Sequence, residues 1–126
     1  MREPAGLREP FRSEDERADY LAQLLDVDRR LELLRAAASL GGADLRRSAA
    51  WMYLANVRPN AGDSVELQLQ RWISIFENDL ATIRQARNQI VHNIWTSDYD
   101  VRAAVWLGGE LFRLVTGERP KWESVS

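Results

Sequence analysis

The 126-residue chain contains no cysteine, a single histidine and a single lysine, and each scarcity excludes a class of site. Without cysteine there is no disulfide, no thiolate metal site and no cysteine nucleophile. One histidine excludes a multi-histidine metal site within one chain. The acidic residues form no dense cluster that would replace it, so we expect neither a metal nor a cofactor.

Long hydrophobic runs are absent as well. No apolar run approaches the roughly 20 residues that an α-helix needs to cross a bilayer. The first residues combine prolines with charges of both signs and lack the apolar core of a secretory signal. We therefore expect a cytoplasmic protein that does not associate with membranes.

Charge is nearly balanced overall but uneven along the chain. The formal net charge is −2, which argues against a bulk polyanion binder. Residues 1–47 hold nine arginines against ten acids, whereas residues 80–97 hold two arginines and no acid. The only histidine, His92, lies in this locally positive segment.

The hydrophobic pattern predicts an all-α, up-and-down bundle of four or five helices in one domain. No segment shows the period-2 alternation of a strand. Prolines and a glycine near the start predict a flexible arm over residues 1–12, and Gly117 predicts the end of the last helix. The domain is expected to span residues 13–117, and residues 118–126 form a C-terminal tail. Apolar residues recur at helical spacing in four segments, over about 13–40, 44–57, 64–94 and 98–116.

The third of these segments is too long for a simple bundle helix. An unbroken helix over residues 64–94 would extend about 46 Å, whereas a compact domain of this size is about 35 Å across. Two residue types that favour helix starts, Asn78 and Asp79, follow each other. They predict a break or kink near residues 77–79, and an unbroken helix that protrudes or dimerises is the alternative.

Residues 79–94 carry most of the functional information. On a helical projection Arg87 falls within the apolar stripe, while Arg84, Asn88 and His92 follow one another at i+4 steps on the adjacent flank. A buried guanidinium requires an anion or carbonyl partner. An acid on the first helix, a subunit interface or a phosphate in a cleft would each provide one. Asn88 lies one turn before His92 and could orient its imidazole.

Arg87 and His92 are separated by about 140° around an ideal helix. They would converge on one atom only if the backbone departs from ideal geometry, if the long Arg87 side chain wraps around the helix, or if a second copy contributes. We expect a two-fold homodimer through the helix of residues 79–94, which would gather two arginines and two histidines around one groove.

The string RNQIVH at residues 87–92 resembles the R-x4–6-H motif of HEPN domains, in the form with asparagine after the arginine. That family has a small up-and-down helical fold that dimerises. The resemblance implies a metal-independent endoribonuclease, often a toxin or defence effector, with Arg87 and His92 as catalytic residues. It also implies that Asn88 orients the histidine or contacts phosphate. The products would be a 2′,3′-cyclic phosphate and a 5′-hydroxyl.

One position departs from the pattern. HEPN toxins paired with nucleotidyltransferase antitoxins usually carry tyrosine two residues after the histidine, and this chain has Ile94. The tyrosine typical of that pairing is therefore missing unless Tyr99 replaces it. We still expect an antitoxin or another partner protein, of unspecified kind. For RNA binding we expect contributions from Arg84, which a solvated helix face would explain equally well, and from Trp95, just beyond the motif.

The alternative function is a non-catalytic HEPN-like module that uses the same helix for dimerisation or partner binding. A phosphate-binding groove between two copies of Arg87 would favour the enzyme. An Arg87 paired with an acid of its own subunit would favour the module.

Overall fold

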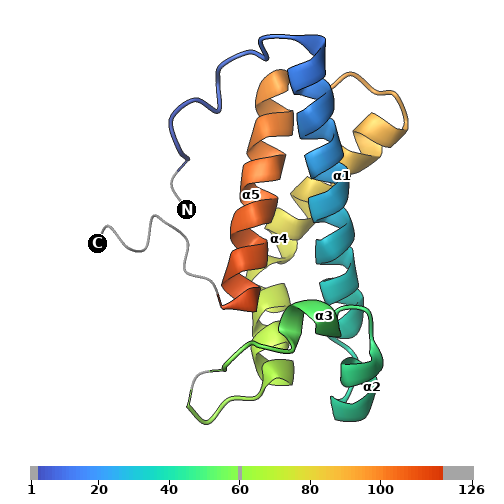
Figure 1. The fold of residues 1–126 in the computed structure, drawn as a ribbon, viewed down its shortest axis with the longest axis vertical. Coiled ribbons are helices and arrows are strands. Elements are labelled where there is room, and N and C mark those ends of the chain that lie inside the picture. Colours follow the sequence, from blue (N-terminus) through green and yellow to red (C-terminus); the bar gives the residue numbers. More distant parts are fainter. Residues whose placement is uncertain (1–2, 60, 118–126) are drawn as a thin grey trace.

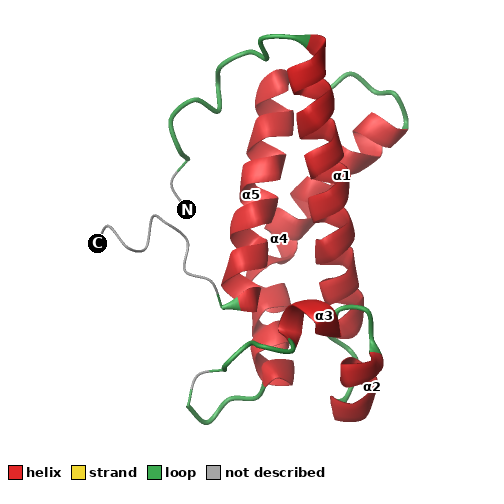
Figure 2. Cartoon of the chain, viewed as in Figure 1, coloured by secondary structure: helices red, strands yellow, loops and turns green. Residues whose placement is uncertain are grey.

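The computed structural model describes residues 3–59 and 61–117, and these residues form helices joined by turns and loops, with no strand (Figures 1 and 2). The all-α prediction is therefore confirmed for this part of the chain, while residues 118–126, expected to form a tail, lie outside it. None of the described helices is both long and apolar enough to cross a membrane. The described residues form five helices: α1 (Glu14–Ala37), α2 (Gly42–Arg47), α3 (Trp51–Leu54), α4 (Val65–Val91) and α5 (Asp98–Thr116).

The three long helices form the body of the molecule. α1 and α5 lie side by side, α4 crosses behind them, and the short helices α2 and α3 lie at the end where α1 finishes and α4 begins (Figure 1). Successive long helices run in opposite directions, as expected for an up-and-down bundle. Serine side chains start each of them: the hydroxyl oxygens of Ser13, Ser64 and Ser97 accept a backbone N–H in the first turn.

The segment expected to form one helix over about 44–57 is instead divided into α2 and α3. Ser48 leaves the helical conformation at φ −74° and ψ 157°. Its hydroxyl donates to the Leu45 carbonyl at 2.7 Å, and its backbone N–H contacts the same oxygen. Serine competes with the helix by bonding to nearby backbone in this way, which explains the break.

The core is a cluster of aliphatic side chains contributed by all five helices, with Trp72 of α4 among them. The indole N–H of Trp72 donates to the Leu111 carbonyl at 2.9 Å, so its one polar atom is satisfied. Each fully buried leucine contributes about 1.5–3 kcal/mol. This core holds α4 against α1 on one side and α5 on the other.

α1 and α5 approach each other closely at Gly108. A Cβ atom added there would lie 2.9 Å from Cγ1 and 3.0 Å from Cγ2 of Val27. Gly108→Ala is therefore expected to lower the free energy of unfolding by about 1–3 kcal/mol through overpacking, measured by urea denaturation. Gly109→Ala is the matched control: its Cβ would have room, so helix propensity predicts a gain of about 0.5–1 kcal/mol. Equal effects at both glycines would contradict this packing.

α4 is interrupted by a kink. Phe76 has non-helical angles of φ −108° and ψ 20° inside the helix, one residue before the interval 77–79 in which a kink was predicted. The part of α4 that follows the kink, which carries Arg84 and Arg87, therefore does not continue the straight axis of the part that precedes it.

The segment before α1 contains no helix and lies beside the start of α5 (Figure 1). Arg102 of α5 donates to the carbonyls of Glu9 and Pro10, and its guanidinium lies 4.5 Å from the centroid of the Phe11 ring. Asp98 accepts the backbone N–H of Phe11 at 2.9 Å. These contacts define how residues 3–12 lie, and their flexibility stays a prediction.

Candidate functional site

α4 ends earlier than residue 94 because of a left-handed residue, Asn93 at φ +55°. The N–H of Asn93 bonds to the Ile90 carbonyl at 3.1 Å, and the N–H of Ile94 bonds to the Gln89 carbonyl at 2.7 Å. This pair of bonds is the Schellman arrangement that closes a helix, and asparagine is among the few non-glycine residues that adopt it readily. The helix therefore stops at Val91.

His92 is consequently the C-cap residue, at φ −91° and ψ 12°, and it is exposed. Arg87 lines an open groove between α1 and α4 and His92 does not, so convergence of the two side chains stays a prediction. Asn88 is linked to His92 through the backbone, where its carbonyl accepts the His92 N–H at 3.0 Å. Among the described residues no side-chain hydrogen bond joins the two, so the orienting role of the Asn88 amide stays a prediction.

Arg87 is paired with an acid of its own chain. Its Nε donates to Oδ2 of Asp28 on α1 at 2.9 Å, and the Asp28 side chain is only 6% exposed against 31% for Arg87. A neighbouring pair repeats the geometry, with Nε of Arg84 at 2.8 Å from Oε1 of Glu32. Asp28 and Glu32 are one turn apart on α1, so the two pairs form a short ladder between α1 and α4.

Both ladder arginines are held through Nε. In this part of the chain no hydrogen bond from their Nη atoms is found, so the guanidinium ends stay available to a further acceptor. Arg87 and Asp28 also line an open groove on the α1–α4 face, together with Leu25 and Val91. The buried acid thus fixes the guanidinium without consuming all of its donors.

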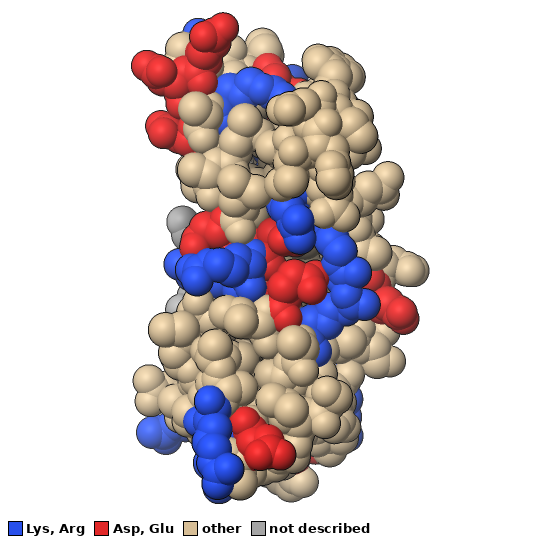
Figure 3. Space-filling model, turned by 90° about the vertical axis from the view of Figure 1, so that its right-hand side faces the viewer, with Lys and Arg blue, Asp and Glu red and all other residues tan. Residues whose placement is uncertain are grey.

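The ladder belongs to a larger band of ion pairs in which arginines outnumber acids. Figure 3 shows side chains of both signs crossing the middle of one face, with mostly uncharged surface directly above and below them. Arg30 Nε lies 3.0 Å from Asp26 without hydrogen-bond alignment, so that pair is electrostatic only. Five guanidiniums against three carboxylates leave a formal excess of two positive charges: Arg29, Arg30, Arg35, Arg84 and Arg87 against Asp26, Asp28 and Glu32.

Exposed apolar side chains gather at the end of α4. We call Leu25, Val91, Ile94 and Trp95 the α4-end cluster; each is exposed, Trp95 by 83%. Leu25 and Val91 line the same groove as Arg87, and the other two follow Val91 in the chain. Isolated exposed hydrophobic residues are common, but several together are typical of an interaction surface.

The loop that carries Trp95 is anchored from α1. Arg17 donates to Oδ1 of Asp98 at 2.6 Å and to the carbonyl of Thr96 at 2.9 Å, and Thr96 is buried. The exposure of Trp95 therefore belongs to a loop with a fixed base. We did not predict this anchor, because Arg17 and Asp98 are 81 residues apart in the sequence.

Asp28 was also missed, although the sequence carries a signal for it. It lies four residues after Leu24 and three before Leu31, so it occupies a core position of the first helix as Arg87 does on α4. An acid at a core position of one helix and an arginine at a core position of another indicate that the two side chains form an ion pair.

Comparison of the chain with protein-family models, curated proteins and solved structures finds no match. The likeness to HEPN domains rests on residues 87–92 and on the helical architecture. Among the described residues no group of three His, Asp or Glu side chains is placed to hold a metal ion.

Proposed function

We propose that this protein is a HEPN-like ribonuclease that cleaves RNA without a metal, as a two-fold dimer. The observation that carries the proposal is the position of Arg87: it is held through Nε by buried Asp28 and lines an open groove, and exposed His92 caps the end of the same helix. The toxin or defence role implied by the resemblance belongs to the same proposal, and any antitoxin is unspecified.

The chemistry assigned to these residues is transfer of the phosphate to the neighbouring 2′-oxygen. The imidazole of His92 takes the proton of the ribose 2′-hydroxyl as the 2′-oxygen attacks phosphorus. A guanidinium stabilises the extra negative charge of the phosphorane. The bond to the 5′-oxygen then breaks, and a second acid, His92 of the other copy, protonates that oxygen.

The surrounding charge suits a phosphate substrate better than the net charge suggests. The ion-pair band keeps an excess of two positive charges on a protein whose formal net charge is −2. Arg84 would contribute its Nη donors to phosphate beside Arg87, and Trp95 offers an exposed aromatic face to a base.

A second candidate is the non-catalytic HEPN-like module, and the Arg87–Asp28 pair within one chain favours it. A module needs the pair for folding and the α4-end cluster for association, and it needs nothing from the imidazole. The two candidates share the fold and the dimer and differ in catalysis.

Incubation of the purified chain with RNA in EDTA tests the proposal. The enzyme is expected to leave 2′,3′-cyclic phosphate and 5′-hydroxyl ends, with activity rising with the dimer fraction. Intact RNA at concentrations where the chain is dimeric would select the module. Full activity of a monomer would contradict the proposal that two copies of the chain form the active groove together.

The proposed dimer has its own test in the α4-end cluster. Ile94→Glu is expected to raise the dimer dissociation constant at least about tenfold, because a charge would be buried at the centre of the contact. Sedimentation equilibrium measures it. Ile75→Glu is the matched control, since Ile75 is another exposed isoleucine and lies on α4 outside the cluster. Equal weakening by both variants would place the interface elsewhere.

A further inference from the structure

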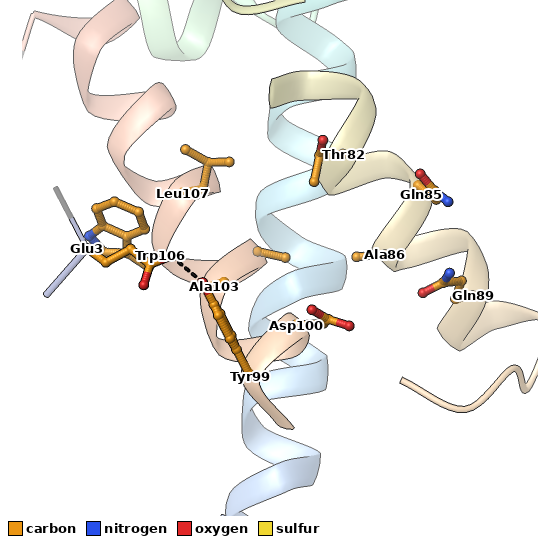
Figure 4. Close-up of a pocket in the computed structure, with 11 residues that line it drawn as sticks. Glu3, Thr82, Gln85, Ala86, Gln89, Tyr99, Asp100, Ala103, Trp106 and Leu107 are labelled. Atoms are coloured by element: carbon orange, nitrogen blue, oxygen red, sulfur yellow. Dashed lines mark hydrogen bonds between the residues drawn. The ribbon is translucent and has the colours of Figure 1, made fainter. Parts of the chain in front are cut away.

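A second hollow lies between α4 and α5, on the other side of α4 from the Arg87 groove, and shares no lining residue with it (Figure 4). Its volume is about 380 Å³, within the range of small-molecule sites. Short side chains, among them Ala86 and Ala103, leave it open between the helices. The motif residues do not use this space.

The lining of the hollow carries negative charge and no cation. Glu3 and Asp100 contribute carboxylates, and the side chains of Thr82, Gln85 and Gln89 are neutral hydrogen-bonding groups. In Figure 4 the Asp100 carboxylate is directed from α5 toward the gap in front of Ala86 and Gln89 on α4. The Arg8 guanidinium beside Tyr99 offsets only one of these two carboxylates, so the electrostatics disfavour a phosphate or carboxylate ligand.

The aromatic wall of the hollow already has a guanidinium beside it. The Arg8 guanidinium lies 4.4 Å from the centroid of the Tyr99 ring, and the Tyr99 hydroxyl donates to Glu3. That hydrogen bond is the main cause that raises the pKa of Tyr99. Trp106 supplies a second aromatic side chain to the lining. Aromatic faces beside carboxylates attract cations.

We propose that the α4–α5 hollow binds an organic cation, a guanidinium or ammonium group carried on a short aliphatic stem. Asp100 and Glu3 supply the opposite charge, the amides of Gln85 and Gln89 accept its N–H groups, and the stem lies against the aromatic and alanine walls. The inference does not depend on the proposed ribonuclease, because it uses neither Arg87 nor His92.

Titrations followed by ¹H–¹⁵N NMR test the site with agmatine, spermidine and a capped Gly-Arg-Gly peptide. Saturable shifts are expected at the Trp106 indole and at the backbone amides of Gln85 and Gln89. Binding of the free amines only identifies a small metabolite as the ligand, and binding of the peptide identifies a side chain of a partner protein; either result supports the shared chemistry.

Two acid variants and one control give the test its specificity. Asp100→Asn and Glu3→Gln should each weaken binding about three- to fivefold, as expected for partly exposed ion pairs. Glu77→Gln removes an exposed acid of α4 outside the hollow and should leave binding unchanged. Absence of saturation up to about 10 mM, equal weakening by the control, or the same shifts with inorganic phosphate would overturn the proposal.

Discussion

His92→Ala is expected to lower the rate of RNA cleavage at least about 100-fold, because it removes the general base and, in the dimer, the general acid as well. The fold should hardly change. His92 is an exposed cap residue held by its backbone N–H, which alanine retains, so the free energy of unfolding should move by less than about 0.5 kcal/mol.

The measurement is a single-turnover cleavage assay in EDTA, with molecular mass determined on the same samples. Asn56→Ala, an exposed polar residue after α3, is a suitable control and should cleave at the wild-type rate. Equal rates for wild type and His92→Ala would end the catalytic assignment. A reduced rate accompanied by dissociation of the dimer would assign the histidine to the interface instead.

The second large effect is expected at Asp28, whose loss leaves the Arg87 guanidinium without its acid. Removing one partner of a buried pair costs about 3–5 kcal/mol. Because the Arg87 side chain is one-third exposed, water recovers part of this, and we expect Asp28→Ala to cost about 2 kcal/mol in urea denaturation. In the ribonuclease the same change frees the guanidinium to move and slows cleavage.

Two further variants separate the ion pair from other causes. Asp19→Ala removes an exposed aspartate of the same helix and should cost less than about 0.5 kcal/mol. The double variant Asp28→Leu with Arg87→Leu should recover most of the lost stability, since apolar replacements of both partners are often neutral or better. Additive losses in the double variant would show that the two residues are not energetically coupled.

Local signals in the sequence accounted for much of the fold. The serine cap at Ser13 and the kink, predicted for residues 77–79 and found at Phe76, are encoded within a few residues. The break at Ser48 and the helix end at Asn93 are local features too. Each depends on one residue that leaves helical geometry, although the hydrophobic pattern would also allow the helix to continue there. Periodicity does not distinguish those outcomes.

The site was predicted less completely, because its partners are distant in sequence. Asp28 is 59 residues from Arg87, and Arg17 is 81 residues from Asp98. A single sequence indicates that Arg87 needs an acid, and Asp28 at a core position is the best candidate, but register between α1 and α4 decides the pairing. Residues 80–97 contain arginines and no acid, which predicted a locally positive segment. In the structure both of these arginines form ion pairs with acids of α1.

The clamp of Arg17 on Asp98 and Thr96 has a consequence for synthesis of the protein on the ribosome. The base of the Trp95 loop is fixed by contacts between the start of α1 and the start of α5, so translation must have passed Asp98 before those contacts exist. Because domains complete their folding as units, the loop after His92 becomes ordered only when α5 has emerged and packed. A nascent chain would therefore carry the motif without its finished surroundings, and a ribonuclease built this way would be silent until α5 has emerged and packed.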